Sequence, residues 1–513
     1  YFFGLNRLPG WSPGAAETAS AWTVPVFGDD AGEPCHQGTF AAGFCQQGWR
    51  WNLDHVQDLH GNVMSYFYEQ ESNAYAMGRR TDVAGAAYTR GGWLKRIDYG
   101  QRAGAVFTAP AAARVVFDTA ERCVPTGDMA CREQDLTAGT ANAWPDVPFD
   151  RLCAVGSVCT DDQASPTFWT RKRVTAITTE IRSGAAWSPV DTWMLEHFFT
   201  DNADGSRTLW LHTITHQGRA GGGDPLVMPT VRLDSLQLDN RIKRPDDPVG
   251  LLIRPRLATV HTDAGGRIDV RYAPTDCSAQ ALPAAGSSVR RCFPVIWHPG
   301  GVTAPVTDWF HKHVVEAVTE TDATTVDPGT GRALDMVTAY EYLGDAAWRR
   351  PAPDGLGDPA YVSWSEWRGY EKVRVRQGRQ DAMTTLTEHT YLRGMHGDQQ
   401  PGGGTRTVVR TDSAGGSYVD EDELAGFEIE TATFNGNDVI TKTITSPWRY
   451  ETASQTWDWG TDRAYFVLPQ TVRSFTALES GGWRETRSTT TYDPRTDAYL
   501  DPVRRVTQVE AFG

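Results

Sequence analysis

Alternation of apolar and polar residues with a period of two is the feature that most constrains the fold of this chain. It recurs at Arg267–Tyr272, Lys372–Arg376 and Trp483–Thr491. In the first run, Ile268, Val270 and Tyr272 fall on one face of an extended strand. Helical periodicity is scarce, so the amphipathic helices that parallel βαβ units require are missing from the pattern. The sequence predicts an all-β fold, a long meander of antiparallel strands and hairpins.

One hairpin is indicated directly by the residues between Trp51 and Tyr68. Apolar residues at the start lie mostly on one side of an extended segment. Asp58 and Gly61-Asn62 supply turn chemistry, and residues 63–68 alternate again on the way back. A strand, a tight turn and a returning strand are the simplest interpretation.

The same stretch carries a recognisable pattern. It reads Trp-x-Leu-x-x-Val-x-Asp-x-x-Gly-Asn over residues 51–62, then Tyr-x-Tyr at 66–68, then Leu-x-x-Ile-x-Tyr-Gly at 94–100. This pattern resembles the Rhs/YD-repeat family, which includes polymorphic toxins, the B components of insecticidal toxin complexes and teneurins. The resemblance covers most of the chain. The segments that look like the variable region upstream of the repeat core in actinobacterial Rhs proteins are Ser188–Gly218, Leu238–Ile242, Tyr340–Leu343 and Trp364–Arg376, and Tyr492-Asp493-Pro494 with Val506–Gly513 looks like the start of a repeat array.

The resemblance implies a spiralling β-sheet shell that encloses a C-terminal toxin domain and releases it at a target cell. Residues 1–513 would form one continuous piece of that shell, and the chain's own toxin cargo would be its partner. Possible sub-units are 1–108, 151–300 and 301–513, with a loop-rich insertion at 109–150, where Ala, Pro and Thr are frequent. Any enzymatic activity would then lie outside this segment, and no cofactor is expected.

Composition supports a large, soluble, secreted or cell-surface chain. A length of 513 residues allows roughly three units of about 150 residues. The net charge of −15 argues against a nucleic-acid partner, because duplex binding needs a local excess of Lys and Arg. No stretch approaches the roughly 18 uninterrupted apolar residues of a membrane helix. Both ends look cut from a longer protein.

The eight cysteines fall into four neighbour pairs. The pairs are Cys35 with Cys45, Cys123 with Cys131, Cys153 with Cys159, and Cys277 with Cys292. Zinc sites usually place cysteines two to four residues apart, and a redox motif would read Cys-x-x-Cys; neither spacing occurs. Four disulfides that staple loops are therefore predicted, with eight free buried thiols as the alternative.

Several motifs suggest catalysis or metal binding but are incomplete. Asp247-Pro248-Val249-Gly250-Leu251 matches the short signature before self-cleavage in Rhs proteins, yet it lacks the tyrosine-rich surroundings, so a proline-bounded loop is favoured. His311 and His313 would share one face of a strand, but no third ligand has suitable spacing. Nucleophile elbows, zinc-protease motifs and phosphate loops are absent.

The 19 tryptophans have two possible uses, core packing and exposed binding platforms. Those within strand patterns, such as Trp51, are predicted to face inward. Trp348, Trp457 and Trp459 have polar or flexible neighbours and are the candidates for an exposed platform. They support the alternative function of a secreted carbohydrate-binding or adhesive β-module. A secreted hydrolase, which would need two carboxylates in one cleft, ranks last.

Overall fold

The computed structural model describes residues 1–28, 31–39, 41–127, 129–221, 223–245, 247, 249–299, 302–326, 329, 331, 333–353, 357–379, 382–492 and 505–512. Nearly all regular structure in these ranges is β-strand, so the predicted all-β class is confirmed. The short 3-10 helices are η1 (Met77–Arg79), η2 (Glu133–Asp135), η3 (Ala141–Ala143), η4 (Phe149–Arg151), η5 (Asp161–Gln163), η6 (Pro359–Tyr361) and η7 (Asp422–Leu424).

The chain forms two compact units. Unit 1 is Tyr1–Asp201, Gly205–Leu233 and Thr262–Ala264; unit 2 is Asn202–Asp204, Asp234–His261 and Gly265–Gly513. The division falls inside the range 151–300, which the sequence had suggested as one sub-unit. Each unit is described separately below.

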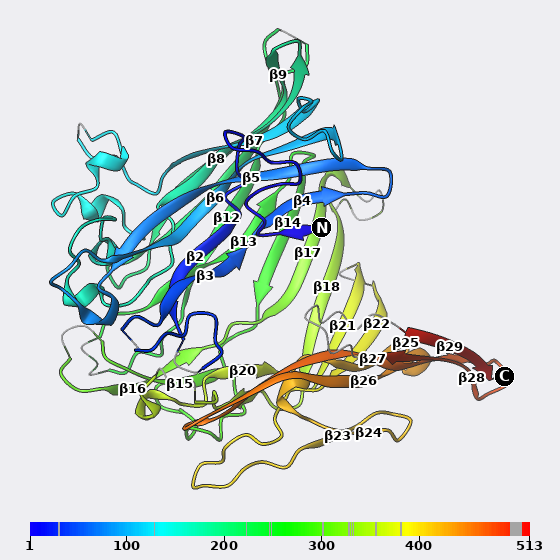
Figure 1. Ribbon diagram of the computed structural model, residues 1–513. Helices are drawn as coiled ribbons and strands as arrows, with labels where there is room; N and C mark the ends of the chain where they lie inside the picture. Colours follow the sequence, from blue (N-terminus) through cyan, green and yellow to red (C-terminus); the bar gives the residue numbers. More distant parts are fainter. Residues whose placement is uncertain are drawn as a thin grey trace. The chain divides into compact units, whose positions relative to one another are not determined.

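Unit 1 is built on one antiparallel ladder. Its strands are β1 (Phe2–Phe3), β2 (Ala21–Phe27), β3 (Phe44–Trp51), β4 (Leu53–Gln57), β5 (Asn62–Tyr75), β6 (Ala86–Arg102), β7 (Ala113–Glu121), β8 (Lys172–Ser183), β9 (Ala186–Asp201), β10 (Arg207–Gly218), β11 (Leu226–Val227) and the start of β12 (Val231–Asp239). From β4 to β10 each strand pairs with the next in sequence, and β1 pairs with β4. Figure 1 shows β5, β6, β7 and β8 side by side. Strands β2 and β3 form a separate pair.

Unit 2 contains a second long ladder. Its strands are β13 (Ile253–His261), β14 (Gly266–Tyr272), β15 (Cys292–Trp297), β16 (Val306–His311), β17 (Val315–Val326), β18 (Ala333–Leu343), β19 (Ala347–Arg349), β20 (Glu366–Gly369), β21 (Lys372–Arg379), β22 (Ala382–Tyr391), β23 (Val409–Thr411), β24 (Ser417–Val419), β25 (Glu428–Asn435), β26 (Asp438–Trp457), β27 (Gly460–Ala477), β28 (Trp483–Tyr492) and β29 (Arg505–Phe512). The ladder runs β13, β14, β17, β18, β21, β22, β25, β26, β27, β28, β29, all antiparallel.

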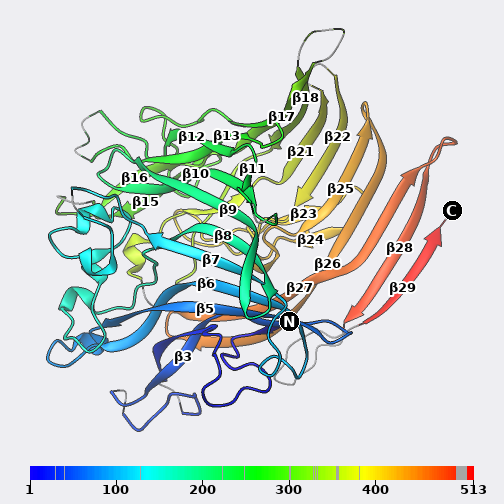
Figure 2. The same ribbon diagram turned by 90° about the horizontal axis from the view of Figure 1, so that it is seen from above.

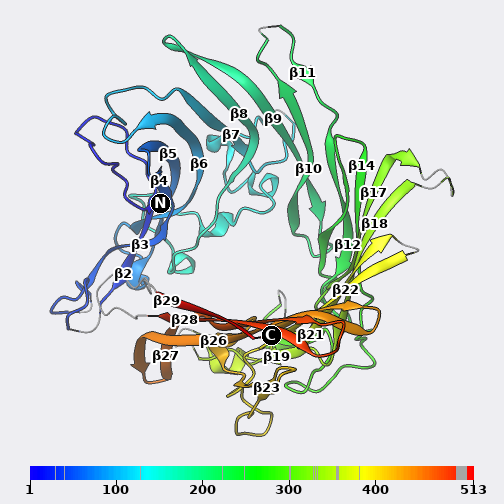
Figure 3. The same cartoon turned by 90° about the vertical axis from the view of Figure 1, so that its right-hand side faces the viewer.

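Three strand pairs of unit 2 stand apart from its ladder. They are β15 with β16, β19 with β20, and β23 with β24. In Figure 2 the ladder strands from β17 to β25 follow one another as a curved row. The β23–β24 hairpin projects away from the β26–β27 strands in Figures 1 and 3. These three pairs lie outside the hydrogen-bonded ladder of unit 2.

The predicted hairpin at residues 51–68 is present as the end of β3, then β4, a turn and the start of β5. Asp58 Oδ1 accepts hydrogen bonds from the backbone N–H groups of His60 (2.9 Å) and Asn62 (2.8 Å), and Gly61 has a φ of 75°. A side chain would strain that left-handed position, which explains the glycine. The expectation that Trp51 faces inward is wrong, because its side chain is 60% exposed at the end of β3.

The predicted loop-rich insertion at 109–150 is wrong in its bounds, because it includes a ladder strand and ends before the loops do. Ala113–Glu121 forms β7, which pairs with β6 and β8. Its central Val-Val-Phe run favours a strand, whereas the Ala- and Pro-rich residues just before it suggested a loop. The real insertion, called the excursion from here on, is residues 122–171 between β7 and β8, and it contains η2 to η5.

In several ladder strands, β10, β13 and β18 among them, the residues on both faces of the sheet are half-buried. Ten or more consecutive residues of β10 are half-buried. All residues of β13 and most residues of β18 are also half-buried. Packing against a second layer would instead bury every other residue. The buried apolar clusters are small and form where a loop or hairpin crosses a sheet, such as Leu392, Leu424 and Ile429. Among the described residues, the buried apolar clusters do not form the continuous aliphatic core of a sandwich.

All eight cysteines are joined in the four pairs that their spacing indicated. Cys123–Cys131 and Cys153–Cys159 lie in the excursion, Cys35–Cys45 closes the β2–β3 connection, and Cys277–Cys292 ties a loop to β15. The bridges hold connections between strands, while the ladders are held by their own hydrogen bonds.

Reduction with dithiothreitol is expected to loosen the connections and leave both ladders paired. Each bridge restricts the unfolded chain by about 2–4 kcal/mol, and each ring is local. Hydrogen exchange followed by mass spectrometry should show faster exchange in residues 122–171 and 273–291, with β17 and β18 unchanged. Equal loss of protection in the ladders would contradict a purely local role for the bridges.

Candidate functional site

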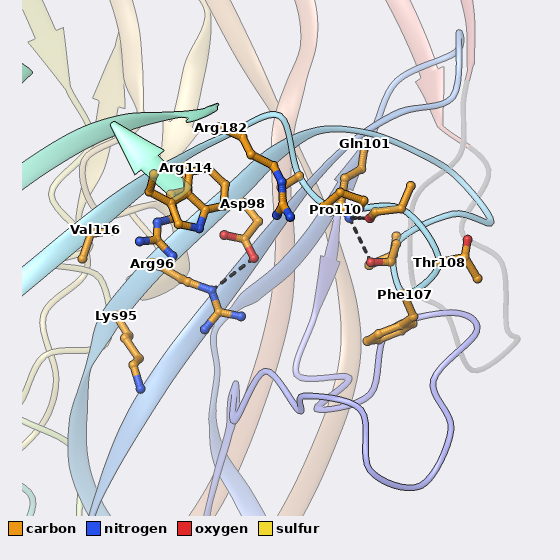
Figure 4. Close-up of a pocket in the computed structure, with 14 residues that line it drawn as sticks. Lys95, Arg96, Asp98, Gln101, Phe107, Thr108, Pro110, Arg114, Val116 and Arg182 are labelled. Atoms are coloured by element: carbon orange, nitrogen blue, oxygen red, sulfur yellow. Dashed lines mark hydrogen bonds and ion pairs between the residues drawn. The ribbon is translucent and has the colours of Figure 1, made fainter. Parts of the chain in front are cut away.

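A cavity of 670 Å³ lies in unit 1 on the face of β6 to β9, beside the loop that joins β6 to β7 (Figure 4). Four cationic side chains contribute to its wall, together with one carboxylate, Asp98. Aromatic walls come from Phe107 and Trp187. The four cations are Lys95, Arg96, Arg114 and Arg182.

Strand register explains why these charges meet. Asp98 on β6 lies opposite Arg114 on β7, which lies opposite Glu180 on β8, and Arg182 lies opposite Trp187 on β9. Residues two apart on a strand share a face, so Arg96 and Arg182 join this row. Opposite charges on facing positions attract each other across the sheet.

Most of the cations already have anionic partners. Arg96 Nε lies 3.1 Å from Asp98 Oδ2, Arg114 Nε lies 2.5 Å from Glu180 Oε2, and Lys95 pairs with Glu69. The Arg114 guanidinium also covers the Trp187 ring, 4.2 Å from its centroid. These interactions satisfy much of the positive charge before any ligand arrives.

One wall of the cavity is fixed by the buried side chain of Gln101. Its Nε2 donates to the carbonyl oxygens of Val106 (2.9 Å) and Ala109 (2.6 Å), and Figure 4 shows both bonds. Among the lining residues there is no histidine or cysteine and only one carboxylate. The hollow can contact a polar or anionic group through its cationic side chains.

A buried ionic cluster anchors the excursion to the ladder of unit 1. Arg90 on β6 pairs with Glu71 on β5 at 3.0 Å, with both side chains at most 4% exposed. Arg171 at the end of the excursion pairs with Glu121 on β7 at 3.2 Å, and Trp144 Nε1 donates to the same carboxylate at 3.2 Å. Burial lowers the pKa of Arg90, and the nearby positive charge of Arg171 adds to this effect.

These carboxylates are engaged in structural pairs. Glu121 also forms an ion pair with Lys172 at 2.6 Å. Its carboxylate therefore contacts two cations, Arg171 and Lys172, and the indole N–H of Trp144. A second cavity of 450 Å³ adjoins the cluster. Glu71 and Glu121 are therefore each paired with cations in this cluster.

The prediction that Trp348 is an exposed platform is wrong. Its side chain is 3% exposed on β19. The ring stacks on Phe293 with centroids 4.6 Å apart, and its Nε1 donates to the carbonyl of Arg290 at 2.8 Å. The residues next to Trp348 in the sequence do not indicate this packing, because its contacts Phe293 and Arg290 lie more than 50 residues away in the chain.

Trp457 and Trp459 lie together at the tip of the β26–β27 hairpin. Their rings are nearly parallel, 5° apart, with centroids separated by 5.1 Å. Trp459 is 41% exposed, and Trp457 is half-buried with its Nε1 donating to Asp462 Oδ2 at 3.0 Å. The structure thus places two of the three candidate tryptophans in one accessible pair.

Asp247, from the self-cleavage-like motif, is held in a buried ion pair with Arg241. Burial raises the pKa of Asp247, but hydrogen bonds from Val249 N and Arg241 outweigh it, and its pKa lies below the ordinary value. Pro248 lies outside the described residues. A carboxylate held ionised by an arginine is an anchor for the loop.

His311 and His313 have ring centroids 5.8 Å apart. Burial lowers the pKa of both rings, and the Nε2 atom of His313 lies 2.9 Å from the carbonyl oxygen of Asp239. Within the part of the chain that the structure describes, no group of three His, Cys, Asp or Glu side chains could hold a metal ion. The same part contains no helix long and apolar enough to cross a membrane.

No family model matches this chain, and no curated protein matches it. Among solved structures, the crystal structure of TcdB2-TccC3 is similar at 9% identity, over 94% of this chain and 39% of that one, with a TM-score of 0.38. A Photorhabdus luminescens Tc holotoxin pore is similar at 8% identity, over 93% and 39%, also with a TM-score of 0.38. This chain spans 39% of the length of both. The TM-scores are too low to support conclusions about function.

Proposed function

We propose that this chain is part of the wall of an Rhs/YD-type β-sheet shell, which encloses a C-terminal toxin domain and delivers it to a target cell. The observation that carries the proposal is the half-burial of residues on both faces of the ladder strands β10, β13 and β18. A sheet of a solid domain buries one face against a second layer. A wall between solvent and an enclosed space has no such layer.

The way these sheets are stabilised fits a wall. Oppositely charged side chains on neighbouring strands form ion pairs, such as Arg374 with Glu388 (2.8 Å) and Arg473 with Glu485 (2.8 Å). Such pairs stabilise a sheet whose faces remain polar. Backbone pairing along a continuous antiparallel ladder leaves few free edges, so such a sheet can be large without a thick core. The four disulfides favour an oxidising compartment and hence secretion. In this proposal the segment itself has no enzymatic role.

Electron cryo-microscopy of the parent protein that contains residues 1–513 would test the proposal. The expected map is a hollow β-sheet spiral with this segment in its wall and additional mass inside. Protease treatment of the intact particle should leave the enclosed domain uncut, and controlled denaturation should expose it. Solid sandwiches with no interior space, or a toxin domain that is cut at once in the intact particle, would reject the shell.

A second function is favoured by the stacked pair of Trp457 and Trp459, namely glycan binding at the β26–β27 tip. An exposed indole face can stack on the apolar face of a sugar ring. Glycan-array binding should be lost in the double variant Trp457→Ala with Trp459→Ala and kept in Trp483→Ala, whose ring is 38% exposed on the neighbouring β28. Equal binding by all three proteins would exclude the tip as a glycan site.

A further inference from the structure

Three arginines surround a small cavity in unit 2, separate from the cavity in Figure 4. The cavity measures 170 Å³ and lies between β19, β23 and the loop that follows β22. Its walls include Arg393, Arg406 and Arg410, and a single carboxylate, Asp345, whose residue is exposed.

Arg393 is 8% exposed, and its guanidinium is incompletely satisfied. Its Nη1 donates to the carbonyl of Asp345 at 2.7 Å, and its Nη2 lies 4.0 Å from Glu371 Oε2. No acceptor in the described ranges lies within hydrogen-bonding distance of its Nε. A buried cation with so weak an ionic partner is costly, because burial removes its hydration.

Arg410 competes for the same carboxylate. Its Nη1 lies 2.8 Å from Glu371 Oε2, and its Nε also has no acceptor within the part of the chain described. Burial lowers the pKa of Arg393, and the positive charge of Arg410 adds to this effect. One carboxylate oxygen therefore serves two neighbouring guanidinium groups that repel each other.

The other carboxylates nearby have their own partners. Asp420 accepts the backbone N–H groups of Arg393 (2.6 Å), Gly394 (2.7 Å) and Met395 (3.2 Å). Asp398 is bound by Arg406 at 2.9 Å and by the backbone N–H of Arg350 at 3.0 Å. Neither can turn to the Arg393–Arg410 pair without giving up these bonds.

We propose that this cavity binds one small tetrahedral oxyanion, phosphate or sulfate, between the guanidinium groups of Arg393 and Arg410. Arginine presents planar N–H groups that match phosphate and sulfate oxygens. An anion there would relieve the repulsion between the two cations and supply acceptors that the protein lacks. It would also connect β23 with the loop after β22, the two segments that carry Arg410 and Arg393.

Isothermal titration calorimetry with inorganic phosphate and with sulfate, at constant ionic strength in chloride, tests the proposal on the full chain. Saturable binding is expected for the wild type. Arg410→Gln should weaken it at least tenfold, and Arg410→Lys, which keeps the charge, should weaken it less. Arg376→Gln removes an exposed arginine from β21 of the same unit and should leave binding unchanged.

Glucose 6-phosphate distinguishes a free ion from the phosphate group of a larger ligand. The small volume of the cavity, 170 Å³, predicts that this ester binds much more weakly than inorganic phosphate, and equal binding would overturn the assignment to a free ion. Absence of heat with both inorganic ions, together with unchanged hydrogen exchange of residues 392–411 in folded wild-type protein, would show that the cavity holds only water and would overturn the proposal.

Discussion

Replacing Arg241 with methionine is expected to lower the free energy of unfolding of unit 2 by about 3–5 kcal/mol, since one partner of a buried ion pair is removed. The Arg241 guanidinium binds Asp308 twice, through Nε at 2.8 Å and Nη2 at 3.1 Å, and also pairs with Asp247. The side chains of Arg241 and Asp308 are each 1% exposed. The variant removes the buried cation that Asp247 and Asp308 share and leaves Asp308 paired with the partly exposed Arg244.

The loss should depend on pH in a defined direction. The native pKa of Asp247 lies below its ordinary value, because hydrogen bonds from Val249 N and Arg241 outweigh the effect of burial, which raises it. Its stabilising contribution is therefore complete above the ordinary carboxyl pKa and is lost as pH falls through the native pKa. The difference between wild type and Arg241→Met should shrink in acid.

Hydrogen exchange of residues 234–313 across a urea series measures this effect locally, without assuming that the two units unfold together. Arg244→Met is the matched control. Arg244 also pairs with Asp308, at 3.1 Å, but its side chain is 46% exposed, so less than about 1 kcal/mol should be lost. An equal loss of unfolding free energy in Arg241→Met and Arg244→Met would show that burial does not determine how much these ion pairs stabilise the protein.

The second large effect is expected for Trp144→Ala, which should destabilise the excursion by about 3–5 kcal/mol. Trp144 is 1% exposed and packs with Cys123, Ala143 and Val147 in the cluster that forms the core of this segment. The substitution leaves a cavity and removes the indole N–H that Glu121 accepts at 3.2 Å. Hydrogen exchange and limited proteolysis of residues 122–171 should both accelerate.

Trp51→Ala provides the comparison within the same unit. Trp51 is 60% exposed, so its removal costs little burial and should change stability by less than about 1 kcal/mol. A larger loss for Trp51→Ala than for Trp144→Ala would mean that the excursion has no core of its own. Protection of β5 and β6 should stay near wild type in both variants, since their ladder is held by backbone pairing.

Several features of the fold follow from local sequence patterns. Alternation at Arg267–Tyr272 predicts a strand, and β14 covers Gly266–Tyr272. Asp58 and Gly61 predict the turn before β5, because both residues act through the backbone of their own segment. The cysteine pairs could be inferred because each partner lies within 15 residues, where loop closure is easy.

Positions that depend on distant partners could not be predicted in this way. Trp51 and Trp348 exchanged their expected environments, since burial depends on which strand or loop crosses a residue. The cavity in Figure 4 exists because register sets Arg182 opposite Trp187 and Arg114 opposite Glu180. No signal in sequence singled out the buried arginines Arg90, Arg241 and Arg393, because their carboxylate and carbonyl partners lie up to 79 residues away.

The all-β class, the turn at residues 58–61 and the pairing of the cysteines follow from local sequence patterns. Each of these is set by the conformational preferences of a few adjacent residues or by short loops. Only the tertiary structure decided which charges are buried and which tryptophans are exposed. Burial and ion pairing arise where segments far apart in the chain pack together, and the energy of a charge depends on the solvent that this packing removes.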